Sequence, residues 1–505
     1  MLLSRRELAG SIERHIGISF GAEIHLWRTT ESKPLLDTER SVPMSDWRDT
    51  EYLWGRSPAD SPTVPLHYPL LAVFAIVVSI APSTWYFSTD QGYLLSAVVL
   101  AAITVYGVVF TGVRLSTDPA FLVLFGGYWL GLMVQYRFHA PQTELFYVAL
   151  SAPLAVFATV VVLPRFVEGR RQTFAMALTL AAVAVALVGI LVLWWAGTAD
   201  TDLPDFIGEE VMGLYAIRTV SVFSNPNPYG FFMMIGCLAA LYTVLVRGGL
   251  VWIVALGICV LGLIMSEGDA ALAGVSVGTI IVLAGRHRLL SFLGIGVGVA
   301  VLYAGIRIGH VSEVMQTTLM SRINLWVRSV ELLAADPLWG IGFADVGSQI
   351  GIGREFDHSS IYPPLSSDTG TSSGPHNSYL YPLLSTGVIA GSLYLGSLVY
   401  ALGRGIRGRW TAWKGFVVGT AAGIYVYMAF ESHFLGGLGV SSVVFGLFVG
   451  LMLLTEPEES ERESRPATAR EALATSRLAS ALTRVQQRAA ERDGTGSRRE
   501  SRRNG

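Results

Sequence analysis

Charged side chains are scarce in this chain of 505 residues: 15% of the residues are Asp, Glu, Lys or Arg, whereas 52% are hydrophobic. A soluble domain carries roughly 25% charged residues, so the deficit argues against a soluble protein and for one embedded in a lipid bilayer. Lysine is nearly absent, since Lys33 and Lys414 are the only two. The net charge of −2 points to no partner, and nothing in the pattern indicates nucleic-acid binding.

Cysteine and the common cofactor motifs are lacking as well. Cys237 and Cys259 lie inside apolar runs, so they provide neither a disulfide framework nor metal-ligand spacing. The sequence has no P-loop, no nucleophile elbow and no GxGxxG fingerprint. We therefore expect neither a metal site nor a cofactor.

Long apolar segments are what the sequence does contain. A helix needs about 20 apolar residues to cross a bilayer, and the pattern between two hydrophilic ends, 1–66 and 455–505, predicts an all-α polytopic membrane protein of about twelve spans. The eighth segment is short, which leaves a re-entrant or tilted helix as an alternative. The predicted spans are 69–87, 92–113, 119–136, 143–163, 173–195, 225–246, 249–266, 269–285, 289–307, 377–402, 411–430 and 434–454.

The arginines of the short loops predict the orientation, because cytoplasmic loops are enriched in Lys and Arg. The loops on one side carry ten arginines, and those on the other side carry only Arg137. We therefore place the Arg-rich side and both termini in the cytoplasm, with the protein in the plasma membrane. The ten are Arg114, Arg165, Arg170, Arg171, Arg247, Arg286, Arg288, Arg404, Arg407 and Arg409.

Two long segments, 196–224 and 308–376, are then extracytoplasmic. In the second, apolar residues recur at steps of three and four, which predicts an amphipathic helix over 313–335 on the membrane surface or the bundle. The cytoplasmic tail 455–505 is rich in Arg and Glu and is predicted to be partly disordered. It is either a solvated tail or one whose arginines contact anionic headgroups. The apolar stripe consists of Met315, Leu319, Ile323, Trp326, Val330 and Leu333.

Three residues of the predicted outward face are candidates for chemistry. Arg322 flanks the apolar stripe, where a guanidinium needs an anionic partner and fits phosphate oxygens. Arg218 precedes an Asn-Pro-Asn-Pro run, and His376 lies at the mouth of the tenth span, where an imidazole can act as a base. Each also has a structural interpretation: a snorkelling Arg322, a salt bridge from Arg218 to the acidic loop before it, and a hydrogen-bonding His376.

Further polar residues lie on the same predicted side. Asn227 begins a span, where it either caps the helix or lines a cavity. Glu431 and His433 form a second titratable pair near the membrane surface. With Trp326 and Asn377, these residues complete the predicted substrate-binding set.

The order and spacing of these residues resemble the O-antigen ligase/polymerase family over roughly residues 67–454. An Arg-x-x-Leu-Trp helix leads to a Pro-x-x-Gly-x-Gly turn, and a His-Asn-x-x-Leu segment then opens a Gly-rich span. Arg218 ahead of Phe223-Ser-Asn-Pro-Asn227 is similar to the family's other arginine. The other matching stretches are Arg322-Ile-Asn-Leu-Trp326, Asp336-Pro-Leu-Trp-Gly-Ile-Gly-Phe343 and His376-Asn-Ser-Tyr-Leu380, with Gly387 and Gly391.

The resemblance implies a GT-C-like fold and a metal-independent glycosyltransferase. Such an enzyme moves a glycan from a polyprenyl-diphosphate carrier to a hydroxyl of a glycan, glycolipid or glycoprotein acceptor on the extracytoplasmic side. By position, Arg218 and Arg322 hold the diphosphate and His376 assists the acceptor hydroxyl. Ligases that use a lipopolysaccharide core often have glycine eight residues after the histidine. That position is Leu384 here, so polymerase and ligase both stay open.

A transporter or flippase for an anionic or lipid-linked substrate is the alternative function, in which the same arginines bind a passing anion. A transporter is expected to carry ionisable residues or broken helices at mid-bilayer, in repeated halves. The predicted spans are nearly free of charge at mid-depth, and no internal repeat is visible. A scaffold protein would leave the arginines and His376 without a role. The oligomeric state is not predicted.

Overall fold

The computed structural model describes most of the predicted membrane domain. The ninth predicted span, Arg218, and almost all of both hydrophilic ends lie outside the described residues. The described ranges are 64–84, 86–111, 117–138, 143–198, 209–211, 214–216, 221–266, 268–284, 310–342, 346, 350, 374–408 and 410–454.

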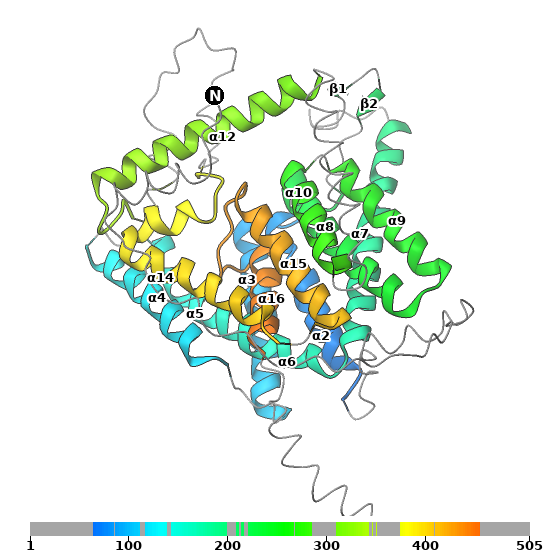
Figure 1. The fold of residues 1–505 in the computed structure, drawn as a ribbon, viewed down its shortest axis with the longest axis horizontal. Helices are drawn as coiled ribbons and strands as arrows, with labels where there is room; N and C mark the ends of the chain where they lie inside the picture. Colours follow the sequence, from blue (N-terminus) through cyan, green and yellow to red (C-terminus); the bar gives the residue numbers. More distant parts are fainter. Residues whose placement is uncertain are drawn as a thin grey trace, which may run out of the picture. The chain divides into compact units, whose positions relative to one another are not determined.

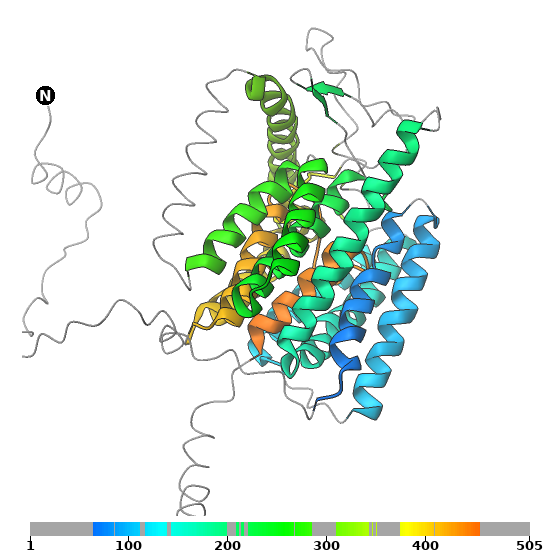
Figure 2. The same ribbon diagram turned by 90° about the vertical axis from the view of Figure 1, so that its right-hand side faces the viewer.

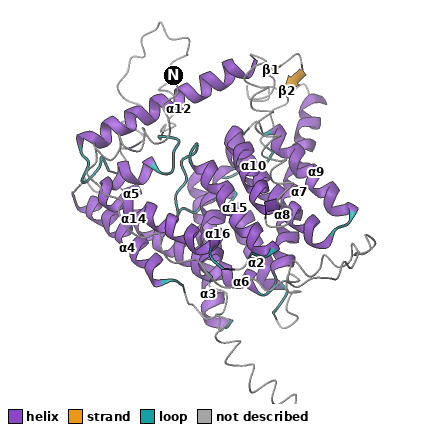
Figure 3. Ribbon diagram, in the orientation of Figure 1, coloured by secondary structure: helices purple, strands orange, loops and turns teal. Residues whose placement is uncertain are grey.

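Helices make up nearly all of the described structure (Figures 1 and 3). Two short strands, β1 (Glu209–Val211) and β2 (Leu214–Ala216), form an antiparallel hairpin in the predicted outer loop 196–224. The helices in chain order are α2 (His67–Val78), η2 (Ala81–Ser83), α3 (Thr89–Phe110), α4 (Pro119–Phe138), α5 (Thr143–Val156), the π-helical η3 (Phe157–Val162), α6 (Leu163–Glu168), α7 (Arg171–Thr198), α8 (Pro226–Arg247), α9 (Leu250–Met265), α10 (Asp269–Ala284), α12 (His310–Ala335), α14 (Leu380–Ile406), α15 (Ala412–Met428) and α16 (Val440–Leu453).

The helices overlap the predicted spans wherever the structure describes them, so the helical character is confirmed. Among the described residues, five helical segments are long and apolar enough to cross a membrane, and five apolar helices are shorter. One of the shorter helices is α10, the eighth predicted span, with 16 residues. The number of twelve spans stays a prediction. The five long segments are Thr89–Phe110, Leu150–Glu168, Arg171–Val192, Pro226–Arg247 and Leu380–Ile406.

Charge is confined to the ends of the membrane helices. Outside α12, every Asp, Glu, Lys or Arg in the described helices lies within the first or last turn of a continuous helical segment. A charged group at the bilayer centre is costly, and this distribution avoids that cost. The residues concerned are Asp90, Arg137, Glu144, Arg165, Glu168, Arg171, Arg247, Asp269, Arg404 and Lys414.

Two helices, α10 and α15, approach so closely that glycines face each other across the contact. A Cβ atom at Gly274 would meet the carbonyl group of Gly423, and one at Gly278 would meet that of Gly419. Small residues allow such backbone contact between membrane helices, where dispersion and packing hold helices together. Helix α15 is thereby fixed in the bundle, and its C-terminal end leads into the candidate site.

Helix α12 lies across one end of the bundle, at the top of both Figure 1 and Figure 2. The turn that follows it, Pro337–Gly342, packs against a break in α14. Gly387 interrupts the helix with φ 78°, and the amide of Val388 donates to the carbonyl of Pro337 at 2.8 Å. A Cβ atom at Gly387 would clash with the carbonyl of Leu338. The break therefore lets two backbones pair directly.

Two more contacts hold the same turn. The amide of Ile341 donates to the carbonyl of Leu384 at 2.8 Å. The buried side chain of Gln135 on α4 donates to the carbonyl of Trp339. Leu384, which stands where some ligases have glycine, is thus a buried part of this joint. The turn fixes the position of the C-terminal end of α12 against the bundle.

We predict that Gly387→Ala destabilises the protein. The substitution forces a side chain into left-handed backbone and against a carbonyl group, which costs roughly 2–5 kcal/mol. Thermal melting of the purified protein in detergent measures the loss. Gly403→Ala is the matched control, because a Cβ atom at Gly403 of the same helix would meet no neighbouring atom within 4 Å. Equal melting temperatures for the two variants would contradict the proposed joint.

Candidate active site

The carboxylate of Glu431 is the centre of a polar cluster at the bundle end that α12 covers. Glu431 lies in the turn between α15 and α16, and its side chain is 7% exposed. Its Oε1 accepts hydrogen bonds from Asn227 Nδ2 at 2.9 Å and from Arg322 Nη2 at 3.0 Å. Its Oε2 lies 3.5 Å from Nδ1 of His376. One buried carboxylate therefore joins three side chains from distant parts of the sequence.

Arg322 reaches this carboxylate from α12. Its side chain is 15% exposed, and its guanidinium group lies over the ring of Phe430, 5.6 Å from the centroid. Glu431 is thus the anionic partner that Arg322 is expected to need beside the apolar stripe. A guanidinium group has five N–H donors, and the ion pair with Glu431 leaves others for an anionic ligand.

The face of α12 that packs against the protein is only part of the predicted apolar stripe. Val330 of the stripe is 54% exposed, whereas Ser329 is buried and donates to the carbonyl of Leu325 at 2.7 Å. The docked turn after the helix sets this rotation, because Leu325 and Leu332 pack against the cluster that contains Leu384. Arg322 lies seven residues, or about two helical turns, before Ser329, so it shares the buried face and points inward.

Arg328 lies away from the site. Its guanidinium group pairs with Glu331 of the same helix at 3.4 Å, and both side chains are well exposed. The two arginines of α12 therefore occupy different environments, one buried against a carboxylate and one in a surface pair.

His376 is held in an unusual backbone conformation just before α14. Its φ is 43°, in the left-handed region that few residues other than glycine adopt. Trp326 of α12 donates from Nε1 to the carbonyl of the preceding Pro375 at 3.1 Å. The imidazole is 42% exposed. With Nδ1 toward Glu431, Nε2 lies on the opposite edge of the ring and can contact a ligand.

Asn377 positions the segment that carries His376. Its Oδ1 accepts from the amides of Tyr379 at 2.9 Å and Leu380 at 3.0 Å, which caps the start of α14. Its Nδ2 donates to the carbonyl of Ala429 at 3.0 Å, at the end of α15. The side chain thus joins two helices, and its hydrogen-bonding groups are occupied by backbone.

The two asparagines that begin α8 have separate roles. Asn225 is the cap, because its side chain accepts from the amide of Asn227 at 2.8 Å. Asn227 contacts Glu431 with its side chain, and its carbonyl accepts from the hydroxyl of Tyr427 at 3.1 Å. The preceding turn is tied to η2 by the amide of Ser224, which donates to the carbonyl of Ser83 at 2.7 Å.

His433 lies beneath the cluster. Its ring is parallel to that of Tyr427, with centroids 5.6 Å apart, and its amide donates to Ser378 Oγ at 2.7 Å. Burial lowers the pKa of His433, while the nearby Glu431 opposes the shift and His376 adds to it. Its Nε2 is buried without a hydrogen-bond partner among the described residues. His433 is therefore a neutral imidazole at neutral pH.

Three residues of the cluster are absent from the predicted set. Ser378 donates to the carbonyl of Glu431 at 2.5 Å, Phe430 lies under Arg322, and Tyr427 holds Asn227. Ser378 is adjacent to the His-Asn pair and could have been included on that ground. The aromatic residues belong to an apolar run, where nothing in the pattern distinguishes them from lipid-facing ones.

The sequence predicts eight site residues. Glu431 and six of the others lie together in one region, and the remaining one, Arg218, lies outside the described part of the chain. Among the described residues, no three His, Cys, Asp or Glu side chains are grouped so as to hold a metal ion. The Arg322 guanidinium has N–H donors that Glu431 does not use and can bind an anion. The His376 imidazole is oriented by the Glu431 carboxylate and can transfer a proton.

Residues 232–395 match the family model described as O-antigen ligase, and no curated protein matches the chain. The matched segment includes Arg322, Trp326, His376 and Asn377. Glu431 lies beyond it, so the centre of the cluster comes from a part of the chain that the family model does not cover.

We predict that Glu431→Gln lowers the stability of the protein by about 3 kcal/mol, because Arg322 loses its buried counter-charge. The matched control is Glu331→Gln, which removes the exposed partner of Arg328 and is expected to cost less than about 0.5 kcal/mol. Thermal melting in detergent compares the two variants. Similar melting temperatures would contradict a central role for the Glu431 carboxylate.

We also predict that acid weakens the fold through His433. Above about pH 6.5 the imidazole is neutral in both the folded and the unfolded chain. As the pH falls further, the unfolded chain binds a proton that the folded chain does not, so stability drops until the lowered pKa is reached. Melting temperatures between about pH 7.5 and 5.5 should fall less for His433→Phe than for the natural protein. Parallel profiles for His433→Phe and the natural protein would refute this assignment.

Proposed function

The chain belongs to the O-antigen ligase family through residues 232–395, and on that premise we propose that it transfers a glycan from a polyprenyl-diphosphate carrier to an acceptor hydroxyl. The reaction takes place on the extracytoplasmic face of the plasma membrane, and the protein acts as a polymerase or a ligase in surface-polysaccharide assembly. The observation that carries the proposal is the convergence of Arg322 and His376 on the carboxylate of Glu431.

In this proposal, Arg322 binds the diphosphate of the carrier lipid. The oxygens of the diphosphate take up guanidinium donors that Glu431 does not use. Positive charge beside the leaving diphosphate stabilises the negative charge that develops as the glycosidic C–O bond breaks. Arg218, which lies outside the described residues, supplies the second guanidinium group.

His376 is the general base. Its Nε2 accepts the proton of the acceptor hydroxyl as the oxygen attacks the anomeric carbon of the donor sugar. Glu431 accepts from Nδ1–H, which fixes the ring orientation and stabilises the imidazolium that forms. The separation of 3.5 Å between Nδ1 and Oε2 is consistent with a contact that tightens when substrate binds.

The remaining predicted residues position these groups or complete the donor site. Trp326 and Asn377 fix the backbone on either side of His376. Asn227 donates to Oε1 of Glu431, the same oxygen that Arg322 contacts. His433, neutral beneath the cluster, adds no competing positive charge.

The distribution of charge favours an enzyme over a transporter. Transported anions need polar or charged groups near the middle of the bilayer. In the described membrane helices the charged residues lie in terminal turns, and the polar cluster is confined to one end. A surface reaction centre fits this arrangement better than a path through the bundle.

We predict that Arg322→Ala and His376→Ala abolish glycan transfer. Loss of a general base typically lowers a rate by about 10²–10⁴-fold, and Arg322→Ala also removes the cation at the leaving group. Arg328→Ala is the matched control on the same helix and should be mild. The measurement is surface polysaccharide in a strain that depends on this protein, with membrane levels of each variant checked. Near-normal glycan in either active-site variant would rule out its assigned role.

Lipid-linked intermediates in the inactive variants separate the two activities. Short lipid-linked units accumulate if the protein is a polymerase, and full-length lipid-linked chains accumulate if it is a ligase. If neither accumulates, the donor assignment is wrong.

A further inference from the structure

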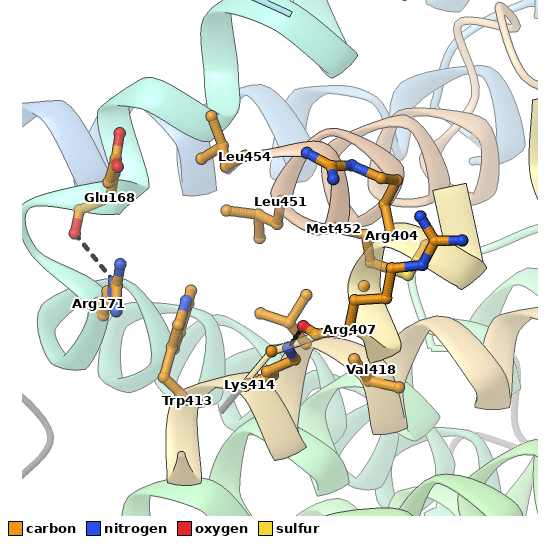
Figure 4. A pocket seen from close by; sticks show the side chains of 13 residues that line it. Glu168, Arg171, Arg404, Arg407, Trp413, Lys414, Val418, Leu451, Met452 and Leu454 are labelled. Carbon is orange, nitrogen blue, oxygen red and sulfur yellow. Dashed lines mark hydrogen bonds between the residues drawn. The ribbon is translucent and has the colours of Figure 1, made fainter. Parts of the chain in front are cut away.

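A second feature lies at the opposite end of the same helices. A cavity of about 540 Å³ opens between the start of α7, the end of α14, the start of α15 and the end of α16 (Figure 4). Helix α15 has Lys414 at this cavity and leads to Glu431 at the other end. Its 17 residues separate the two regions by about 25 Å along the helix axis. The cavity is thus distinct from the candidate active site.

Positive charge dominates the lining. Four basic side chains and one acidic side chain, that of Glu168, line the cavity. Glu168 pairs with Arg165 at 3.0 Å, and Arg404 is partly neutralised by Asp118 at 3.3 Å. The basic residues are Arg171, Arg404, Arg407 and Lys414.

The two walls present their cations differently. Arg171 lies over the ring of Trp413, 5.7 Å from the centroid, and donates from Nε to the carbonyl of Glu168 at 3.1 Å. These contacts hold its guanidinium at the cavity while leaving other N–H donors. Arg407 extends from the opposite wall and is exposed. Its guanidinium makes no hydrogen bond or ion pair with the described residues.

Backbone adds to the positive potential on one side. The N-terminal ends of α7 and α15 both lie at the cavity, and helix N-termini attract anions through their free N–H groups and the helix dipole. The other side is apolar, with Leu451, Met452 and Leu454 from the end of α16. Cationic side chains from α7, α14 and α15 together with the apolar end of α16 suit an amphiphile with an anionic head.

We propose that this cavity binds the phosphate group of an anionic membrane lipid. Guanidinium groups match phosphate oxygens in a bidentate geometry, and the apolar wall accommodates the first carbons of the lipid tails. The Arg-rich end is the predicted cytoplasmic side, where anionic lipids are attracted by basic pockets between membrane helices. The proposal does not depend on the transferase reaction.

Binding of phosphatidylglycerol by the full-length protein tests this proposal. The protein is held in phosphatidylcholine nanodiscs, and the dissociation constant is measured by native mass spectrometry as phosphatidylglycerol is added. We expect saturable binding that weakens about 25-fold in the Arg171→Gln, Arg407→Gln double variant, since each cation contributes about a factor of five. Arg407→Gln alone, an exposed position, should weaken binding about fivefold and serves if the double variant does not fold.

Arg247→Gln is the matched control. Arg247 ends α8 at the same end of the bundle but does not line the cavity. Its loss should leave the dissociation constant unchanged.

Inorganic phosphate is the second probe. If it does not displace the lipid, the lipid is the ligand. If it displaces the lipid at comparable concentration, the site serves soluble phosphates and the lipid assignment is overturned. Equal lipid binding by the natural protein and the Arg407→Gln variant, or equal losses in Arg407→Gln and Arg247→Gln, also overturns the proposal.

Discussion

A single buried carboxylate determines how the end of the bundle under α12 is assembled. An ionised group removed from water must be compensated by opposite charge and hydrogen bonds. Glu431 obtains that compensation from Arg322 of α12, Asn227 of α8 and His376 before α14. The requirement fixes four chain segments relative to one another, because none of these partners lies near Glu431 in the sequence. The same contacts orient the groups that the proposed reaction uses.

The position of Arg322 depends on backbone hydrogen bonds formed just after the C-terminal end of α12. The turn Pro337–Gly342 is hydrogen-bonded to α14 on both sides of the break at Gly387. Gly340, with φ 71°, faces the carbonyl of Leu384 in the same joint. This backbone contact sets the rotation of α12 about its axis and thus the direction of Arg322. Gly340 and Gly387 therefore help to position the site, because they allow the backbone contact that orients α12.

The two ends of the bundle differ in chemistry. One end combines a carboxylate, a cation and a histidine with left-handed backbone, and the other gathers arginines and a lysine around a cavity. Between them the described membrane helices carry no Asp, Glu, Lys or Arg outside their terminal turns. Such separation allows each end to interact with its own leaflet and aqueous phase without placing charge in the hydrocarbon region.

The apolar runs alone were enough to establish the helices, since such a run in a bilayer must satisfy its backbone internally. The pattern of polar residues also identified Arg322, His376, Asn227 and Glu431 as members of one predicted face. The pattern did not establish which face of α12 packs against the protein, since Val330 of the apolar stripe is exposed whereas Ser329 is buried. Only the folded chain shows that Glu431 is the shared partner, because its contacts join residues as many as 204 positions apart. Periodicity reports the local burial of a helix, whereas the pairing of charges depends on how distant helices pack.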